Sequence, residues 1–231
     1  MMFGLVSGAY RGPRSDPAKG FRTDMTLMYL FHDALRRDVE QLARIAARTT
    51  DDPRDVLRTA VGWEMFKSYL HVHHAAEDEF LWPTMRTLLV GQPDDLLLLD
   101  AMEAEHGVLD PLLAAIEAAL VDREGGPEQL GPLVDDLTTG LIGHLRHEEA
   151  EALPLIDATL SAEQFRAFGS AHPRWIGADM PRYLPWLLDG AADKDAALVL
   201  ALMPEPLRIA YRDEWKSAYG RVDLWGASAE R

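Results

Sequence analysis

Two stretches of this chain share one pattern: HHAAEDEFLWP at residues 73–83 and HLRHEEAEALP at residues 144–154. In both, a glutamate follows a histidine by four residues and a proline follows the glutamate by six, giving His-x3-Glu-x5-Pro. Residues four apart lie one turn apart on the same face of a helix. The two pairs are His73 with Glu77 and His144 with Glu148. A pattern of this length that occurs twice predicts an internal repeat of helical segments.

Each repeat is preceded by a further histidine in the apolar stripe of an expected helix. His32 stands four residues after Met28, and His106 stands four residues after Met102. These positions continue the steps of three and four that are typical of the buried face of a helix. The sequence therefore predicts two similar hairpins, each of which turns one single histidine and one His-x3-Glu pair inward.

The apolar stripes and the turn signals between them predict four long helices. Turn-forming residues separate these helices at 51–55, 91–95 and 125–127. Helices joined by such short connections must run up and down beside their neighbours. We therefore expect an all-α fold, an up-down-up-down four-helix bundle in residues 24–157, with helices at about 24–49, 54–90, 96–122 and 128–155. The prolines at 83 and 154 should bend or end their helices.

Two segments of different composition flank the expected bundle. Residues 1–23 are rich in glycine and proline and predict an irregular N-terminal arm. Residues 158–231 predict a C-terminal helical extension that packs on the bundle. Within it, SAEQ at 161–164 fits a capping box. The aromatic residues of the extension should form a second small core; the alternative is that they cover an open edge of the bundle as a pocket wall. Its short helices are expected near 162–170, 178–188, 194–203 and 206–219.

Composition excludes several classes of protein. The chain has no cysteine, which removes thiolate metal sites, thiol nucleophiles and disulfide scaffolds. Its formal net charge of −15 argues against a nucleic-acid partner. The longest uninterrupted apolar run, Ala196–Met203, is far shorter than a membrane span requires. We expect a cytoplasmic protein with no membrane partner, whose oligomeric state the sequence leaves open.

The inward histidines and glutamates suit a metal site. Imidazole and carboxylate donors without thiolate favour iron, manganese or zinc. Two glutamates from neighbouring helices are able to bridge two ions, with two histidines serving each ion. Inward placement of Glu77 and Glu148 would be very costly without a cation. Residues 24–157 hold 27 acidic and ten basic side chains, and these two glutamates are a small buried part of that excess.

Three neighbouring residues have open interpretations. His74 and Asp78 form an alternative pair with the same spacing of four, one residue further along than His73 and Glu77. His74 is a less favoured additional ligand, because the proline alignment supports His73. Tyr69 lies one turn before His73 and is a candidate catalytic residue that would donate a proton or an electron to bound oxygen. An ordinary core tyrosine is the favoured interpretation. Glu105 faces either solvent or a neighbouring helix, or it supports a ligand.

The doubled motif resembles the hemerythrin-like, HHE cation-binding family over residues 25–157. This resemblance implies a four-helix bundle that holds a non-haem di-iron centre with an oxo, hydroxo or water bridge. Manganese or zinc in place of iron is the alternative. By the match, the metal ligands are His32, His73, Glu77, His106, His144 and Glu148.

The chain departs from the oxygen-carrying members of that family at two positions. Met102 stands where they have a second histidine on the third helix, and Glu149 stands where they have an aspartate. These changes favour a centre that binds and reacts with O2 or peroxide, as an oxidase or a catalase-like activity. The alternatives are a non-enzymatic oxygen or iron sensor, store or carrier, and an oxidase of a specific small metabolite.

Overall fold

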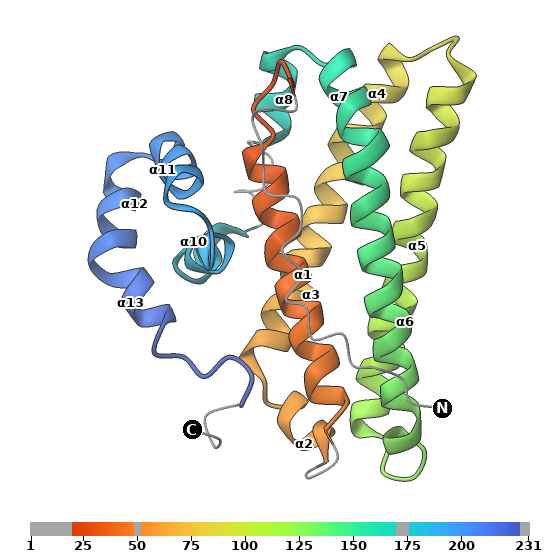
Figure 1. The fold of residues 1–231 in the computed structure, drawn as a ribbon, viewed down its shortest axis with the longest axis vertical. Helices are drawn as coiled ribbons and strands as arrows, with labels where there is room; N and C mark the ends of the chain where they lie inside the picture. Colours follow the sequence, from red (N-terminus) through yellow and green to blue (C-terminus); the bar gives the residue numbers. More distant parts are fainter. Residues whose placement is uncertain (1–19, 49–51, 170–175, 227–231) are drawn as a thin grey trace.

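The computed structural model describes residues 20–48, 52–169 and 176–226, and within these ranges it is all-helical with no strand. Long helical segments stand side by side and alternate in direction (Figure 1), as the sequence predicts. The expected hemerythrin-like, all-α bundle is therefore confirmed. The bundle consists of α1 (Thr26–Ala46), α3 (Val61–Ala76) with its continuation α4 (Trp82–Leu88), α5 (Pro93–Val121), and α6 (Gly126–His147) with its continuation α7 (Leu153–Thr159).

The second expected helix, 54–90, is interrupted near its start. A short helix α2 (Pro53–Leu57) precedes α3, and residues 58–60 separate the two. The turn-forming residues at 51–55 start α2 as a separate helix, because Asp52 caps it by accepting a hydrogen bond from the backbone N–H of Arg54 at 3.0 Å. Proline at the first position of α2 fits the helix start, where its missing N–H costs no hydrogen bond.

Of the two effects expected of the motif prolines, to bend or to end their helices, the structure does not show the second, because the helices continue past them. A π-helical turn follows each motif glutamate: η2 (Glu77–Leu81) links α3 to α4, and η3 (Glu148–Ala152) links α6 to α7. In these turns the backbone N–H of Trp82 donates to the carbonyl of Glu77, and that of Leu153 donates to Glu148. Each proline is the second residue after its π-helical turn. Single π-helical turns are frequent at functional sites.

The buried apolar residues of the bundle form two clusters, with polar residues between them along the helix axes. On α3, Val72 belongs to the first cluster and Ala76 to the second; on the fourth long helix, Leu145 and Ala152 are divided in the same way. The first cluster also contains side chains of α10 (Met180–Leu188), and the second contains side chains of α4, α7 and α8 (Ala162–Gly169). The residues between the clusters include the motif histidines and glutamates.

The C-terminal extension contacts the bundle through its first helix, through its later helices and through its last described residues. Its first helix, α8 (Ala162–Gly169), follows α7, and Phe168 packs in the second apolar cluster. Ser161 and Gln164 form the predicted capping box, in which each backbone N–H donates to the other residue's side chain. The later helices gather beside α1 (Figure 1). They are η4 (Gly177–Asp179), α10 (Met180–Leu188), α11 (Asp193–Leu202), α12 (Glu205–Ala210), η5 (Tyr211–Trp215) and α13 (Lys216–Tyr219).

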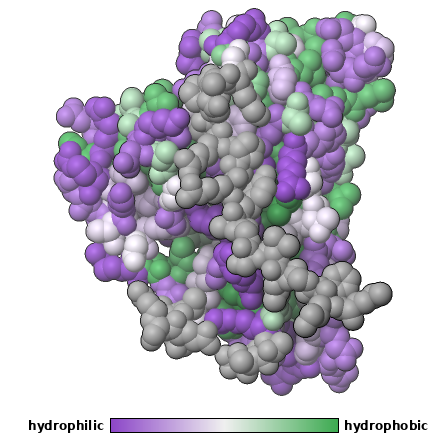
Figure 2. Space-filling model, in the orientation of Figure 1, coloured by the Kyte–Doolittle hydropathy of each residue, from purple (hydrophilic) through white to green (hydrophobic). Residues whose placement is uncertain are grey.

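Most of the expected N-terminal arm, residues 1–19, lies outside the described residues. The last part of the arm, residues 20–23, is non-helical and is attached to α7. The backbone N–H groups of Arg22 and Thr23 donate to the carboxylate of Asp157 at 2.9 and 2.7 Å. Hydrophilic side chains predominate on the face shown in Figure 2. Among the described helices, none has the length and apolar character needed to cross a bilayer.

Candidate metal centre

The six predicted ligands lie together, buried between the two apolar clusters of the bundle. Each is at most 3% exposed. The four long helical segments all contribute, because the two hairpins place their motifs at the same level along the bundle. A seventh side chain, His74, lies among them. The histidines are His32 on α1, His73 and His74 on α3, His106 on α5 and His144 on α6; the carboxylates are Glu77 and Glu148, the first residues of the two π-helical turns.

Three of these residues form a first group able to hold a metal ion: His32, His73 and Glu148. The Nε2 atoms of His32 and His73 are 3.2 Å apart. The Nε2 atom of His32 is also 3.0 Å from Oε2 of Glu148. Three donor atoms at these separations converge on a volume that a single cation would fill.

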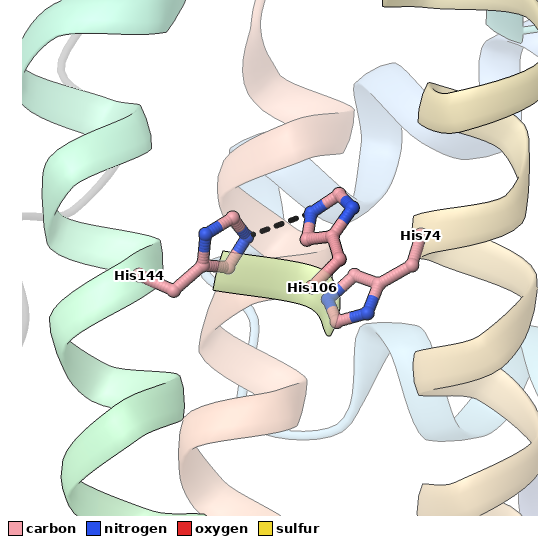
Figure 3. Close-up of side chains that lie close together, drawn as sticks. All are labelled: His74, His106 and His144. Carbon is pink, nitrogen blue, oxygen red and sulfur yellow. Dashed lines mark hydrogen bonds between the residues drawn. The ribbon is translucent and has the colours of Figure 1, made fainter. Parts of the chain in front are cut away.

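A second group consists of His74, His106 and His144, which Figure 3 shows with His106 between the other two. The Nε2 atoms of His106 and His144 are 3.1 Å apart. The ring of His74 stacks on that of His106, with centroids 3.9 Å apart. The sequence ranked His74 behind His73 as a ligand, yet the structure places both rings in the cluster. Consecutive helix residues project about 100° apart, so the two rings reach different groups.

The two glutamates lie between the groups. Glu77 places Oε1 3.4 Å from Nε2 of His73 and Oε2 3.5 Å from Nε2 of His106. Glu148 similarly faces both groups, with Oε2 at 3.0 Å from Nε2 of His32 and at 4.0 Å from Nε2 of His144. Each carboxylate thus contacts one histidine of each group, which is the arrangement of a ligand shared by two ions.

Several polar atoms of the cluster fit a bound cation because they lack other partners. Both carboxylate oxygens of Glu77, Oε1 of Glu148 and both ring nitrogens of His74 are buried without a hydrogen-bond partner in the described part of the chain. A buried polar atom without a partner costs roughly 1–3 kcal/mol, and more when it is charged. Cation binding would offset this cost, so the residues present fit the group that the motif implies.

The electrostatics of the cluster also favour a cation. Burial, and then the negative charge of Glu148, raise the pKa of Glu77 well above its ordinary value. Burial would lower the pKa of His32, but the carboxylates of Glu148 and Glu149 outweigh it and raise this pKa to about 9. Burial and the neighbouring histidines hold the pKa of His74 well below its ordinary value, so its ring is neutral and available as a donor. A metal ion would compete with protons for these atoms.

Acidic side chains orient three of the histidines through hydrogen bonds from Nδ1, the ring nitrogen that points away from the centre. The Nδ1–H groups of His32, His106 and His144 each donate at 2.9 Å to a carboxylate. These bonds fix the ring orientation that turns Nε2 toward the centre. The three acceptors are Glu149 for His32, Asp78 for His106 and Glu105 for His144. Glu105 therefore supports a ligand and does not simply face solvent, and it also accepts a hydrogen bond from His147 at 2.7 Å.

Two of the three supporting acids cross between the two hairpins, which the sequence does not reveal. Asp78, directly after Glu77 in the first hairpin, supports His106 of the second. Glu149, directly after Glu148 in the second hairpin, supports His32 of the first, and it is paired with the buried Arg36 at 2.8 Å. The signal in the sequence is the acidic residue that follows the motif glutamate in both copies.

The comparisons with known proteins agree with this geometry. A family model described as the hemerythrin HHE cation binding domain matches residues 23–156. The chain belongs to this family. The family description makes it a cation-binding protein, and the two groups of donors are where a cation would bind.

Two curated relatives of this hemerythrin-family chain come from Arabidopsis thaliana, and both are named as BRUTUS-like zinc finger proteins. They are 24% identical over 201 residues and 22% identical over 209 residues. Each alignment covers 82% of this chain but only 16% and 17% of the relatives, so the chain spans about one sixth of their length. No solved structure matches the chain significantly.

Three residues singled out in the sequence lie outside the two groups of donors in this hemerythrin-family bundle. The hydroxyl of Tyr69 donates to Asp179 at 2.5 Å, so it is directed to the C-terminal extension rather than into the donor groups. Burial, and then this hydrogen bond, raise the pKa of Tyr69. Met102 is fully buried in the second apolar cluster, and Glu149 supports His32, so neither belongs to the two groups of donors.

Proposed function

We propose that this chain holds two iron ions and that the pair binds and reacts with O2 or peroxide. The observation that carries the proposal is the pairing of two three-donor groups through Glu77 and Glu148. Iron at such a centre would supply one-electron and two-electron chemistry toward oxygen species. We propose His32 and His73 as ligands of one ion and His74, His106 and His144 as ligands of the other, with Glu77 and Glu148 shared by the two ions.

The chain's own residues support iron among the metals. Five imidazoles and two carboxylates are of the donor type that iron, manganese and zinc accept, and a chain without cysteine offers no thiolate for softer ions. Seven protein donors are fewer than two six-coordinate ions require, which leaves positions for a small molecule. The apolar clusters on both sides of the donor layer exclude bulk water from it. The carboxylates behind the histidines keep the donor nitrogens in place.

Metal content tests the proposal directly. Protein purified from iron-replete cells should contain about two iron ions per chain by elemental analysis, as two donor groups require. His73→Ala and His106→Ala should each lose iron, because each removes a donor from a different group. His71→Ala on the exposed face of α3 is the matched control and should keep the full content. Folded wild-type protein with fewer than one iron per chain, or with stoichiometric zinc instead, would refute the proposal.

Reversible oxygen binding, as a carrier or sensor, is the second candidate, and His74 favours it. Its ring makes the cluster richer in nitrogen donors than the sequence indicated, and so closer to that of an oxygen carrier. The two candidates differ in turnover. Reaction with peroxide predicts steady consumption of many equivalents per chain, whereas a carrier or sensor predicts a stable optical spectrum after exposure to air that deoxygenation reverses.

A metabolite oxidase is the third candidate, and a cavity favours it. About 330 Å³ of space lies between the start of α1 and α11, with Tyr29, Lys194 and Leu198 among its lining residues. Burial, and then the negative charges of Glu149 and Glu148, raise the pKa of Tyr29 to about 12, so this lining residue is within electrostatic range of the metal-site acids. Leu198→Trp would fill the cavity. Loss of metabolite oxidation with iron content unchanged would support this candidate, and unchanged oxidation would count against it.

A further inference from the structure

A series of buried aromatic rings connects a candidate ligand to the C-terminal extension. The ring of Phe31 stacks on that of His73, with centroids 4.5 Å apart and planes 13° apart. Phe31 also meets the ring of Trp186 on α10 at 5.2 Å. Trp186 in turn lies 4.6 Å from the ring of Tyr69 on α3. The three aromatic residues are each 1% exposed, so the series is continuous through the protein interior.

The two oxidisable rings of this series each donate a hydrogen bond to a carboxylate. Trp186 Nε1–H donates to Oδ2 of Asp38 at 2.6 Å, and the Tyr69 hydroxyl donates to Oδ2 of Asp179 at 2.5 Å. A tryptophan or tyrosine that loses an electron becomes a strong acid, so its oxidation is easier where a base already holds the proton. Burial raises the pKa of Asp38, which makes this carboxylate a better proton acceptor.

We propose that Trp186 and Tyr69 form a one-electron relay that supplies an electron to the metal centre through Phe31 and His73 during reaction with peroxide. This inference rests on the proposed function, because the oxidant is hydrogen peroxide at the iron pair. The chain contains no cysteine, so tryptophan and tyrosine are its most readily oxidised side chains by one electron. The relay gives the C-terminal extension a role in the chemistry of the bundle.

The electrons and protons of the relay balance as follows. One hydrogen peroxide molecule takes up two electrons, together with two protons that come from outside the relay, and leaves as two water molecules. When a single ferrous ion is available, it supplies one electron and Trp186 supplies the other. The Nε1 proton of Trp186 moves to Asp38, which leaves a neutral tryptophan radical. Tyr69 then gives an electron to Trp186, which recovers its proton from Asp38. The hydroxyl proton of Tyr69 moves to Asp179, and the radical rests on Tyr69.

Two other aromatic residues provide matched controls. Tyr183 lies 5.3 Å from Tyr69, but within the described ranges its hydroxyl makes no hydrogen bond to a carboxylate. Trp63 is buried and donates to Glu117, like Trp186 to Asp38, but its ring neighbour is Phe66 within the bundle. If any buried tyrosine or tryptophan were oxidised alike, these two residues would matter as much as the relay pair.

Rapid-freeze electron paramagnetic resonance tests the relay. Protein loaded anaerobically with one equivalent of ferrous ion per chain, so that a single ferrous ion is available to the peroxide, is mixed with hydrogen peroxide and frozen, while iron oxidation is followed by absorbance. We expect an organic radical in the wild type and in Tyr183→Phe and Trp63→Phe. In Tyr69→Phe we expect the tyrosyl radical signal to be lost. In Trp186→Phe we expect both the tyrosyl and the tryptophan radical signals to be lost. Should Trp186→Phe not fold, Tyr69→Phe carries the test, because it removes only a hydroxyl.

The outcomes separate the relay from the function on which it rests. Unchanged iron absorbance would overturn the proposed function and the relay together. Iron oxidation without an organic radical would overturn the relay alone. A radical that persists unchanged in Tyr69→Phe would do the same.

Discussion

The substitution Glu77→Leu should have opposite effects on the metal-free and the iron-loaded protein. Glu77 is fully buried, and neither of its oxygens has a hydrogen-bond partner in the described ranges. In metal-free protein this side chain therefore lowers the free energy of unfolding. An apolar residue of similar length should remove that loss. In iron-loaded protein the same carboxylate is a proposed shared ligand, so its loss removes metal-dependent stability.

The size of both effects follows from the burial of Glu77. A buried polar group without a hydrogen-bond partner costs roughly 1–3 kcal/mol, so replacing Glu77 by an apolar residue of similar length should stabilise the metal-free protein by about that amount. In a chain of this length each kcal/mol shifts the melting temperature by about 2–4 °C. A ligand present at a hundred times its dissociation constant adds about 2.7 kcal/mol to the free energy of unfolding. The wild type should gain at least this amount on iron loading, and Glu77→Leu should gain much less.

Urea unfolding followed by circular dichroism measures both effects, with samples kept anaerobic and either treated with a chelator or loaded with ferrous ion. Glu79→Leu is the matched control, because Glu79 lies two residues along the same π-helical turn and is exposed. Leucine and glutamate have similar helix propensities, so this control should change neither state appreciably. The reasoning is refuted if Glu77→Leu destabilises the chelator-treated protein, since Glu77 would then be stabilising without a metal.

Three further predictions follow from individual contacts. Glu149→Gln weakens the support of His32 and should lower metal affinity about 10–100-fold in a competitive chelator titration; the exposed Glu151→Gln should leave it unchanged. Ser161→Ala removes the hydroxyl that caps α8 and should cost about 1 kcal/mol in thermal unfolding, and unchanged iron content would show that the effect is confined to the cap. Trp186→Ala should cost about 3–5 kcal/mol in urea unfolding, because it opens a cavity and leaves Asp38 without its indole donor; a loss below 1 kcal/mol would contradict the tight docking of α10.

The sequence predicted the bundle and six residues of the cluster because periodicity carries that information. Histidines that replace hydrophobes at positions 32 and 106 are visible against the steps of three and four. The sequence does not indicate which neighbouring side chain His74 contacts, because a helix that is buried on several sides has more than one inner face. The π-helical turns were also missed, since a single wider turn leaves the apolar pattern nearly intact. The docking of Trp186 against Asp38 depends on contacts 148 residues apart, which no local pattern encodes.

The crossed support of the histidines links metal binding to assembly of the whole bundle. His32 on α1 is held by Glu149 from η3, and His106 on α5 is held by Asp78 from η2. Neither hairpin alone contains both a single histidine and the acid that orients it. Each donor group is likewise drawn from both hairpins: Glu148 joins His32 and His73, and His74 joins His106 and His144. A chain with only one hairpin folded would therefore offer scattered donors rather than half a site, so tight metal binding requires both hairpins to be docked.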